Sequence, residues 1–434
     1  MKYYYIRDPI HGFIELTEWE MVIINRPEFQ RLRRIKQLSL SEMVYPATTH
    51  TRFEHSLGVM HVATQMFDNI VQRNKKFLQQ ELNYDDTALE RQRILIRFAS
   101  LLHDIGHAPF SHAGEELMPY KSGSNAGEGK QRYKHEDYSI AIIDNNFKEY
   151  IDDYKYNYLK ITTDEICELL KDGPSSAQQL FWRNLISSQL DADRADYLLR
   201  DSYHAGVNYG KYDLKRILRT LTIVKDPETE NYFIGIDRSG WHAAEGLIIA
   251  RYQMFSQVYF QHTRKAYDHH ITEILRTLLE ETRGESVFPP PTKEYIDEYL
   301  DWDDWKVVGL IKEGKAGSEG DIILNRNHHR RVYETSEVPD IDELSEFEAI
   351  VSKFEDEIAF VDLAEKSWYK KGDDDIPIVE ENNYQWQPLS EYSSIVKNLA
   401  PCKQKRIYVP YVRKDRVKAQ IERFREELKN GKKL

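Results

Sequence analysis

His103 and Asp104 are adjacent in the stretch from Leu101 to His112, and as a pair they offer a metal ion one nitrogen and one oxygen ligand. Another histidine, His107, lies between this pair and His112. The pair is a weak signal by itself, because polar side chains also cap the ends of ordinary helices. Matching fragments elsewhere strengthen it, since they carry the residues that a phosphate-cleaving metal site needs.

Two such fragments lie on either side of this stretch. Upstream, residues 49–58 supply His55 as a further nitrogen ligand and Arg52 as a clamp for phosphate. Downstream, residues 189–201 supply a run of carboxylates, of which Asp193 is the expected last ligand. A mixed set of histidines and carboxylates suits a borderline divalent ion such as iron, manganese or nickel, and Mg²⁺ could join through substrate phosphates. Such an ion lowers the pKa of a bound water and draws charge from phosphorus.

Helices must bring these side chains together. Apolar residues recur at helical spacing over residues 94–102, which places His103 and Asp104 near the C-terminal end of a buried helix. His107 would share the face of His103 if that helix continued. A glycine and a proline then break the pattern and put His112 on a loop that can reach the same pocket from another side.

The segment 191–201 is also predicted to be a helix. Asp196 and Tyr197 lie three and four residues beyond Asp193, and Asp201 lies four beyond Tyr197. This spacing repeats with the turn of a helix, so one side of the segment is expected to face the pocket.

With these fragments the chain resembles the HD-domain deoxynucleoside triphosphate triphosphohydrolases. The resemblance extends to about residue 270 in a consistent order, which makes it far more specific than any one motif. It rests on Asp8–Gly12, Phe29–Leu38, the two histidine-rich fragments, His135–Glu136, Asp191–Gly206 and Arg264–Tyr267.

The resemblance implies roles for the matching residues at the reaction centre. The implied metal ligands are His55, His103, Asp104 and Asp193. The residues implied around the scissile bond are His107, His112, His135 and Glu136. Expelling the leaving oxygen requires a proton, and a histidine whose pKa is raised by phosphate anions can supply it. We predict that His112 is this acid and that Glu136 orients His135 or His107.

The resemblance also implies substrate contacts. Arg52 would hold an α-phosphate oxygen, and surrounding basic residues would stabilise the developing charge. The implied substrate-binding set is Arg52, Gln37, Leu38, Arg194, Tyr197, Asp201 and Tyr267. In it, Gln37 would read the 3′-hydroxyl of the sugar, and the tyrosines with Asp201 would leave little space for a 2′-hydroxyl. The family arginine that meets the terminal phosphate has no clear counterpart, and only Arg251 or Arg264 could replace it.

In this family a second nucleotide activates a tetramer, and the resemblance gives Gln30, Arg33 and Arg216 to that activator site. The sequence departs from the pattern at two positions. Asn25 replaces an aspartate that reads guanine, and His270 replaces a phosphate-binding lysine. We therefore expect activation by a different nucleotide, or none.

Composition limits the class of protein. The chain has 434 residues, with 60 basic against 72 acidic side chains, and its net charge of −12 argues against nucleic acid as the main partner. Its two cysteines, Cys167 and Cys402, form no Cys-x-x-Cys pair, so neither a disulfide framework nor a zinc ribbon is indicated. No apolar run approaches the roughly 18 residues of a membrane span, and the N-terminus lacks the core of a signal peptide. These features predict a cytoplasmic enzyme.

We predict a mainly α fold, with an HD-domain helical core over residues 1–280 and a smaller mixed α/β lobe over residues 281–434. The proline-rich stretch Phe288–Thr292 marks the break. The resemblance implies that the lobe helps to assemble a homo-oligomer, a dimer or a tetramer. A β-hairpin is predicted at residues 221–236 and an amphipathic helix at residues 413–429.

Other segments have an ordinary structural explanation. Basic and apolar residues over 31–38 predict a helix with one solvated face. His328–Arg331 predicts an exposed basic turn, and the acidic stretches 299–305 and 371–376 predict solvated loops. Residues 121–130 are rich in glycine and serine but lack the spacing of a phosphate-binding loop, so they predict a lid or a solvated loop.

Two other functions stay open. A phosphodiesterase or nucleotidase could use the same metal on a cyclic nucleotide, a monophosphate or a nucleic acid end. Gln37, Tyr197 and Asp201 favour the triphosphohydrolase, because a generic HD phosphodiesterase does not need this sugar reader. A regulatory module could bind nucleotides without turnover, but the full ligand set together with His112 and Glu136 favours catalysis.

Overall fold

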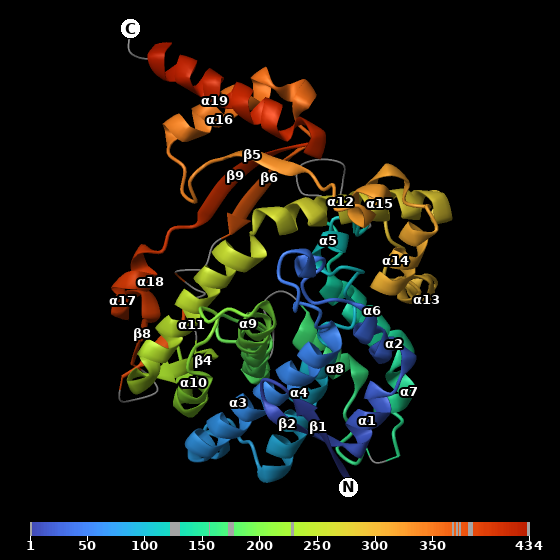
Figure 1. The fold of residues 1–434 in the computed structure, drawn as a ribbon. Coiled ribbons are helices and arrows are strands. Elements are labelled where there is room, and N and C mark those ends of the chain that lie inside the picture. The colour runs from blue at the N-terminus through green and yellow to red at the C-terminus, as the bar shows by residue number, and fades with distance from the viewer. Residues whose placement is uncertain are drawn as a thin grey trace.

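Helices make up most of the chain, and strands are concentrated toward the C-terminus (Figure 1). This confirms the predicted fold class, a mainly α core with a mixed C-terminal region. The structure is a computed structural model, and it describes residues 2–121, 131–155, 157–171, 178–226, 230–366, 369, 372, 375–380 and 385–431.

Two long helices, α3 (Arg52–Gln80) and α4 (Asp86–Leu102), pack against each other in the half of the molecule that contains the N-terminus (Figure 1). Thr51 begins α3 with a capping box. Because α4 ends at Leu102, the chain delivers His103 and Asp104 directly beyond its C-terminal end. The predicted helix before the His-Asp pair is therefore confirmed.

Helix α9 (Ala192–Ala205) packs against α3 and confirms the helix predicted at residues 191–201. Asp191 begins α9, and its carboxylate accepts a hydrogen bond from the backbone N of Arg194 at 2.7 Å. The helix ends at Gly206, whose φ of +69° suits glycine. Asp193 consequently lies in the first turn, beside the helices that carry the other predicted ligands.

The long helix α12 (His262–Arg283) begins next to β9 (Cys402–Val409), where the hydroxyl of Tyr408 donates to the carbonyl oxygen of His262, passes below the C-terminal sheet and ends beside α15 (Gly317–Leu324) (Figure 1). It packs against the short helix α5 (His112–Glu115) and against α15. Its buried face, which includes Tyr267 and Ile271, belongs to the hydrophobic core. The opposite face is left to line a cavity.

The chain begins with an antiparallel hairpin, β1 (Tyr3–Asp8) and β2 (Gly12–Thr17), in which Tyr3 pairs with Thr17. Helix α1 (Glu18–Ile24) follows, with Trp19 and Ile23 buried in the core.

After α2 (Pro27–Gln30) the chain forms a 3₁₀ turn at Arg31–Arg34 and is extended at Ile35. The continuous helix predicted over residues 31–38 is therefore wrong. Arg31 is fully buried, and its Nε and Nη2 atoms donate to the carbonyl oxygen of Trp302 at 2.9 and 2.7 Å. Local spacing could not show this, because the partner of the cation lies far along the chain.

The predicted hairpin at residues 221–236 is confirmed by β3 (Leu221–Lys225) and β4 (Tyr232–Asp237), which pair antiparallel. Residues 227–229 of its turn lie outside the described residues. Two late strands extend this sheet, β7 (Pro377–Val379) parallel to β4 and β8 (Trp386–Pro388) antiparallel to β7.

A second sheet has the order β5 (Arg330–Glu334), β9 (Cys402–Val409) and β6 (Phe360–Lys366), all antiparallel. Helices α16 (Ile341–Lys353) and α19 (Lys414–Gly431) share its small hydrophobic core. The amphipathic helix predicted at residues 413–429 is thus confirmed, with its apolar side chains buried against the sheet.

The expected domain boundary at residue 280 does not coincide with a gap in the packing. Helices α13 (Ile296–Leu300), α14 (Asp304–Lys312) and α15 place Tyr299 and Val307 in the same hydrophobic core as α4 and α12. The segment directly after residue 280 therefore packs with the catalytic half, because its apolar side chains have no separate core of their own.

Two of the expected solvated segments are buried. Asp303 and Asp304 form hydrogen bonds with the 34–36 and 110 segments, so the stretch 299–305 is not a solvated loop. His328 is buried and Arg330 begins β5, so these residues form no exposed basic turn.

In the acidic stretch 371–376, Asp375 is buried and accepts a hydrogen bond from Tyr369, which corrects the loop prediction at that residue. Residues 371, 373 and 374 lie outside the described residues. Of the segment 121–130, only Lys121 is described, so the prediction of a lid or a solvated loop lies outside the described residues as well.

The remaining helices connect these parts. They are α6 (His135–Asn146), α7 (Lys148–Ile151), α8 (Thr163–Leu170), α10 (Leu214–Thr220), α11 (Trp241–Met254), α17 (Leu389–Tyr392) and α18 (Ser394–Asn398), with 3₁₀ turns at Ser41–Met43, Gln178–Leu185, Arg238–Gly240, Glu355–Glu357 and Tyr411–Arg413 and a π turn at Phe255–Tyr259. Across the described residues, no helix has the length and apolar character needed to cross a membrane.

Candidate metal centre and active site

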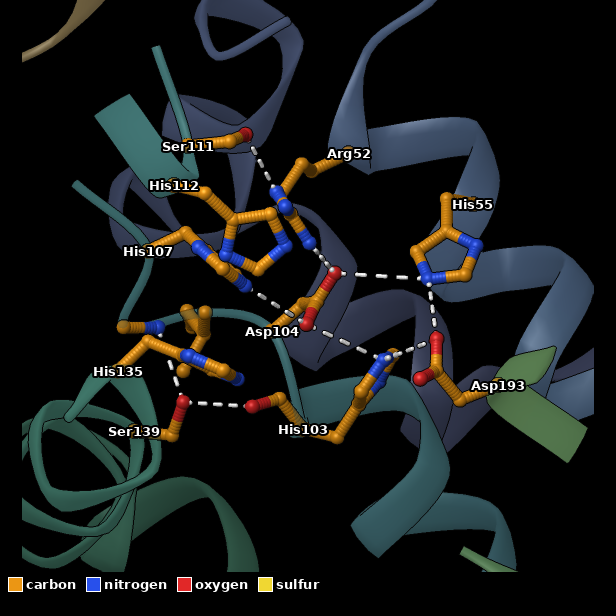
Figure 2. A network of polar contacts seen from close by, with 12 residues as sticks. Arg52, His55, His103, Asp104, His107, Ser111, His112, His135, Ser139 and Asp193 are labelled. Carbon is orange, nitrogen blue, oxygen red and sulfur yellow. Dashed lines mark hydrogen bonds and ion pairs between the residues drawn. The ribbon is translucent and has the colours of Figure 1, made fainter. Parts of the chain in front are cut away.

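The four predicted metal ligands converge from three elements. His55 comes from α3, His103 and Asp104 from the end of α4, and Asp193 from the first turn of α9 (Figure 2). Nε2 of His55 lies 3.0 Å from Oδ1 of Asp193 and 3.5 Å from Oδ2 of Asp104. Nε2 of His103 lies 3.2 Å from Oδ1 of Asp104 and 3.7 Å from Oδ1 of Asp193. The ligand atoms of His55, His103 and Asp104 thus lie within 4.8 Å of one another, and Asp193 lies beside both histidines.

The hydrogen bonds of the two histidines leave the correct atoms for a metal. Nδ1 of His103 lies 2.8 Å from the carbonyl oxygen of Ser100, so that nitrogen carries the ring proton and Nε2 presents a lone pair. Nε2 is buried and makes no hydrogen bond to any described residue. In His55, Nδ1 likewise donates to Asp196, and Nε2 points toward Asp193 and the other ligands. The donor set fits a divalent cation.

Asp196 supports this arrangement without facing the ligand group. Its Oδ2 accepts from Nδ1 of His55 at 2.8 Å, and its Oδ1 lies 2.6 Å from Nε2 of His11. Arg200 donates to both oxygens at 2.8 Å and also to Asp8 at 2.8 Å. The helical spacing of the 191–201 segment contained Asp196, but its role depends on contacts with the N-terminal hairpin that no local pattern shows.

The charges of this group are strongly coupled. Burial would lower the pKa of His55, but its hydrogen bonds to Asp193 and Asp196 raise the pKa to about 10. Burial would raise the pKa of Asp104, but Arg52 and the neighbouring histidines hold it well below its usual range. This concentration of carboxylate charge is what a cation would neutralise.

Arg52 lies beside the ligand group. Its Nη1 forms an ion pair with Asp104, and its Nε donates to the hydroxyl of Ser111 at 2.8 Å (Figure 2). The guanidinium also lines the cavity described below. Its guanidinium is thus placed to contact a phosphate that binds next to the metal.

A second group of histidines adjoins the metal ligands. The rings of His107 and His135 are stacked, with centroids 3.8 Å apart, and the ring of His112 lies 5.4 Å from that of His107. Nε2 of His107 lies 3.3 Å from Oδ1 of Asp104. The structure therefore brings all three predicted catalytic histidines to the metal centre.

Glu115 joins these histidines, and the sequence reasoning missed it. Its carboxylate lies 2.7 Å from Nδ1 of His135, 2.9 Å from Nδ1 of His112 and 3.4 Å from Nδ1 of His107. Glu136, the predicted orienting group, lies farther from Nδ1 of His135, at 3.5 Å. His112 and Glu115 have the i,i+3 spacing of a helix, and this signal becomes readable once α5 is known.

The stacked rings differ in charge. Burial would lower the pKa of His135, but Glu115 raises it to about 9, so this ring is cationic at neutral pH. Burial, Arg52 and the charge of His135 lower the pKa of His107 well below its usual range, so that ring is neutral. His112 is the most exposed of the three histidines and lines the cavity, which gives it access to a substrate.

A cavity of about 750 Å³ opens from the metal ligands. Six of the seven predicted substrate residues line it, namely Gln37, Leu38, Arg52, Arg194, Tyr197 and Asp201. Both arginines that could meet a terminal phosphate, Arg251 and Arg264, line it as well. Residues that the sequence reasoning did not predict in the wall are Ala113, Glu116, Phe255, Tyr259, Phe260, Lys265, Asp268, His269, Thr272, Glu273 and the 360–363 segment of β6.

Tyr267 does not line this cavity, contrary to the expectation. It is fully buried in the core and packs on His328 with centroids 4.5 Å apart. On α12 the cavity face is formed by three pairs that repeat every four residues, Arg264 and Lys265, Asp268 and His269, and Thr272 and Glu273. Tyr267 points away from this face and into the core, whereas the next residue, Asp268, lines the cavity.

The middle of the cavity is polar. Asp201 lies 2.7 Å from Nε2 of His50 and accepts from the hydroxyl of Tyr259 at 2.7 Å. Oε1 of Gln37 is buried without a hydrogen-bond partner among the described residues, and burial raises the pKa of Tyr197 to about 12. Polar donors and acceptors of this kind suit sugar hydroxyls.

The predicted activator residues do not all meet. Arg33 lines a separate hollow of about 340 Å³ with Phe53, and its Nε donates to Gln30 at 2.9 Å. Asn25 lies at the C-terminal end of α1 and does not line that hollow. Arg216 lies on α10, where it donates to the carbonyl oxygen of Ser239 at 2.6 Å.

His270 stands where the family has a phosphate-binding lysine. It lies in a third group of side chains that could hold a metal ion, together with Glu319 and His329. Nε2 of His270 accepts from the backbone N of His329 at 3.0 Å, so Nδ1 carries the proton that is shared with Glu319. Both ring nitrogens are engaged. The group is thus a hydrogen-bonded link between α12, α15 and the start of β5.

Comparisons with known proteins give the family of this chain. Residues 52–201 match the HD domain, and residues 212–429 match the HD-associated region. An uncharacterized protein of Methanocaldococcus jannaschii is 32% identical over 98% of this chain and 84% of its own length. The deoxynucleoside triphosphate triphosphohydrolase SAMHD1 homolog of Dictyostelium discoideum is 33% identical over 51% of this chain and 40% of its own length. The crystal structure of a phosphohydrolase from Bacteroides thetaiotaomicron has a TM-score of 0.70, with 25% identity over 94% of this chain and 100% of that one.

The fold and the ligand geometry define a metal-dependent HD-domain phosphohydrolase. With an HD domain followed by an HD-associated region, the chain belongs to the HD-domain family that includes deoxynucleoside triphosphate triphosphohydrolases. It spans less than half the length of the Dictyostelium triphosphohydrolase that it matches.

Proposed function

We propose that the protein hydrolyses deoxynucleoside triphosphates to deoxynucleoside and inorganic triphosphate. The observation that carries this proposal is one cavity that is lined by the predicted ligands Asp104 and Asp193, by Arg52 and Arg194, and by Gln37, Tyr197 and Asp201. Cationic groups that suit phosphates and polar groups that suit a sugar thus line the same cavity, as a nucleotide requires. The name of the Dictyostelium relative points to the same substrate class.

His55, His103, Asp104 and Asp193 would hold the metal. When bound, a divalent ion supplies an acidified water and polarises the α-phosphorus. The protein then has to place the α-phosphate next to that water. Arg52, fixed by its hydrogen bond to Ser111, binds an oxygen of this phosphate.

The leaving group is the 5′ oxygen of the nucleoside, which separates from the α-phosphorus as the oxygen of water joins it. The 5′ oxygen needs a proton, and His112 is placed to give it. Glu115 accepts a hydrogen bond from Nδ1 of His112 and so orients the ring. As the acid, the ring would act in its doubly protonated form and give the proton on Nε2 to the 5′ oxygen. The cationic His135 and the neutral His107 sit beside the ion pair of Arg52 and Asp104, where charge develops in the transition state.

The side chains that line the sugar-binding part of the cavity would give the preference for a deoxy sugar. Asp201 is fixed by His50 and Tyr259, so it cannot retreat to admit another group. Tyr197 lies against Tyr259 with ring centroids 6.2 Å apart. A 2′-hydroxyl would have to fit between these rigid side chains, while Gln37 offers its unpartnered oxygen to the 3′-hydroxyl.

Activation by a second nucleotide is a further part of the proposal. The hollow beside Arg33 and Phe53 combines a cation with an aromatic ring, 3.4 Å from guanidinium carbon to ring centroid. Such a pair suits a nucleotide base or phosphate. Since Asn25 and Arg216 lie outside it, any activator would use a different set of contacts from the family pattern.

The deciding experiment incubates the purified protein with each of the four deoxynucleoside triphosphates, with GTP and with manganese, and separates the products by chromatography. Free deoxynucleoside with inorganic triphosphate supports the proposal. Monophosphate or diphosphate products would contradict it and favour a nucleotidase or phosphodiesterase. Tight nucleotide binding without any product would favour a sensing module.

A further inference from the structure

A buried carboxylate in the HD-associated region connects two loops of the active site. Asp304, at the start of α14, accepts from the backbone N of Phe110 at 2.7 Å and from the backbone N of Lys36 at 2.9 Å. The first bond uses Oδ1 and the second Oδ2, so both oxygens are engaged. Asp304 is only 2% exposed. It therefore bridges segments that are far apart in sequence.

The two bridged loops carry different parts of the site. The first loop continues from Lys36 into Gln37 and Leu38, which line the sugar end of the cavity. The second continues from Phe110 through Ser111 into His112, the proposed acid. The spacing between sugar and acid therefore depends on how these loops are held relative to each other.

A second contact completes the connection. The hydroxyl of Ser111 donates to the carbonyl oxygen of Lys36 at 2.7 Å and accepts from Nε of Arg52 at 2.8 Å. Both backbone groups of Lys36 are thereby taken, its N–H by Asp304 and its carbonyl by Ser111. The same link also reaches the phosphate clamp.

The second loop needs such support because its backbone is unusual. Phe110 and Ser111 have φ values of +57° and +56°, a region that residues other than glycine adopt at a cost. Such a conformation persists only where the surroundings impose it. The bond from Phe110 N to Asp304 is one of the contacts that impose it.

The carboxylate is costly to keep where it is. Burial raises the pKa of Asp304 to about 7, against the lowering effect of the two backbone N–H groups. The charged residues that act on it are Arg31, Lys36 and Asp303. The two hydrogen bonds to backbone N–H groups offset this cost and need an acceptor with two oxygens.

We propose that Asp304 is a positioning residue that fixes the sugar-contacting loop relative to the loop that leads to His112. Through it the HD-associated region, residues 212–429, takes part in the reaction of the HD domain, residues 52–201. The catalytic consequence rests on the proposed function, whereas the link between the loops does not.

The test is Asp304→Asn, which keeps the shape and one acceptor but turns an NH₂ group toward the other backbone N–H. Misplacement of about 1 Å can cost on the order of 100-fold in rate, so we expect kcat to fall about 10- to 100-fold with KM changed by less than about threefold. Bound metal per chain should stay at the parent level. The unfolding midpoint at pH 8 should change little, because the removal of a buried charge offsets the loss of one hydrogen bond.

Asp303→Asn is the matched control. Asp303 caps α14 and pairs with Arg34. The two bonds that bridge the loops, to the backbone N atoms of Phe110 and Lys36, are made by Asp304 and not by Asp303. We expect it to lower the unfolding midpoint with little effect on kcat. A purely structural Asp304 would instead lose stability and rate together, and that pattern would overturn the proposal, as would a parental kcat in Asp304→Asn.

Amide hydrogen exchange gives a readout that needs no substrate. Peptides that cover residues 33–40 and 105–112 should both exchange faster in Asp304→Asn than in the parent. In Asp303→Asn the 105–112 peptide should be unchanged, and the 33–40 peptide is not used for this control because it contains Arg34, the partner of Asp303. If the parent does not turn over deoxynucleoside triphosphates, the proposed function fails while this measurement still decides the link. Unchanged exchange in either peptide would overturn the link. Should Asp304→Asn fold poorly, Asp304→Ser, which leaves room for a water at both N–H groups, is measured in the same way.

Discussion

The Nδ1 atom of His55 lies 2.8 Å from a carboxylate oxygen of Asp196, and both side chains are fully buried. Asp196 does not face the ligand group, yet it fixes which nitrogen of His55 points toward the metal. Contacts of this kind orient metal ligands and raise their basicity. The N-terminal hairpin supports Asp196 through His11, and through the bond of Asp8 to Arg200.

Asp196→Asn should therefore weaken metal binding about 10- to 100-fold while the four ligands remain. The measurement is a titration of the metal-free protein with manganese, followed by calorimetry. Glu20→Gln is the control, because Glu20 is also a buried carboxylate paired with an arginine, Arg97, but lies away from the ligands. It should lower stability without changing the affinity for manganese, and equal affinities in all three proteins would refute the role of Asp196.

His103→Ala and His112→Ala should separate metal binding from proton transfer. His103→Ala is expected to lose both bound metal and turnover, because its Nε2 is one of only two nitrogen donors in the predicted ligand set. His112→Ala is expected to keep the metal and to lose about 10²- to 10⁴-fold in rate. Elemental analysis and rates on the same samples provide the test. Full turnover by His112→Ala would show that another group is the acid.

The pair of His135 and Glu115 should make stability depend on pH. Glu115 raises the pKa of His135 from 6.5 to about 9 against the effect of burial, so the stabilisation is complete below 6.5 and is lost as the pH rises through about 9. Glu115→Gln should lower the free energy of unfolding by about 1–3 kcal/mol at pH 6, and by much less at pH 9.5. Denaturant titrations of both proteins at the two pH values check this. A difference that does not vary with pH would contradict the ion pair.

Tyr197→Ala should reduce the preference for deoxy sugars. Removal of the ring opens space beside Asp201, and the ratio of kcat/KM for dGTP to that for GTP should fall by about tenfold. Tyr267→Phe is the matched control, since Tyr267 is buried away from the cavity, and it should leave the ratio unchanged. If Tyr267→Phe changed the ratio and Tyr197→Ala did not, the placement of the sugar pocket would be wrong.

The helical periodicity of the sequence predicted the main elements that carry the candidate site. Helices α4 and α9 follow from the spacing of their apolar residues, and their ends deliver the His103–Asp104 pair and Asp193. A helix fixes where its own side chains point, so these residues could be placed on an element from the sequence. The upstream fragment 49–58 supplied His55, the resemblance assigned all four ligands to one metal, and the fold brings them next to one another.

The sequence by itself thus determined the helical class, the ligand types and the chemistry that they can support. Only the tertiary structure decided which carboxylates hold the histidines, that Tyr267 faces the core, and that Arg31 and Asp304 are buried. The physical reason is the range of the interactions. Periodicity reports the neighbours of a residue within one helix, whereas a buried charge is stabilised by partners that only the folded chain brings within hydrogen-bond distance.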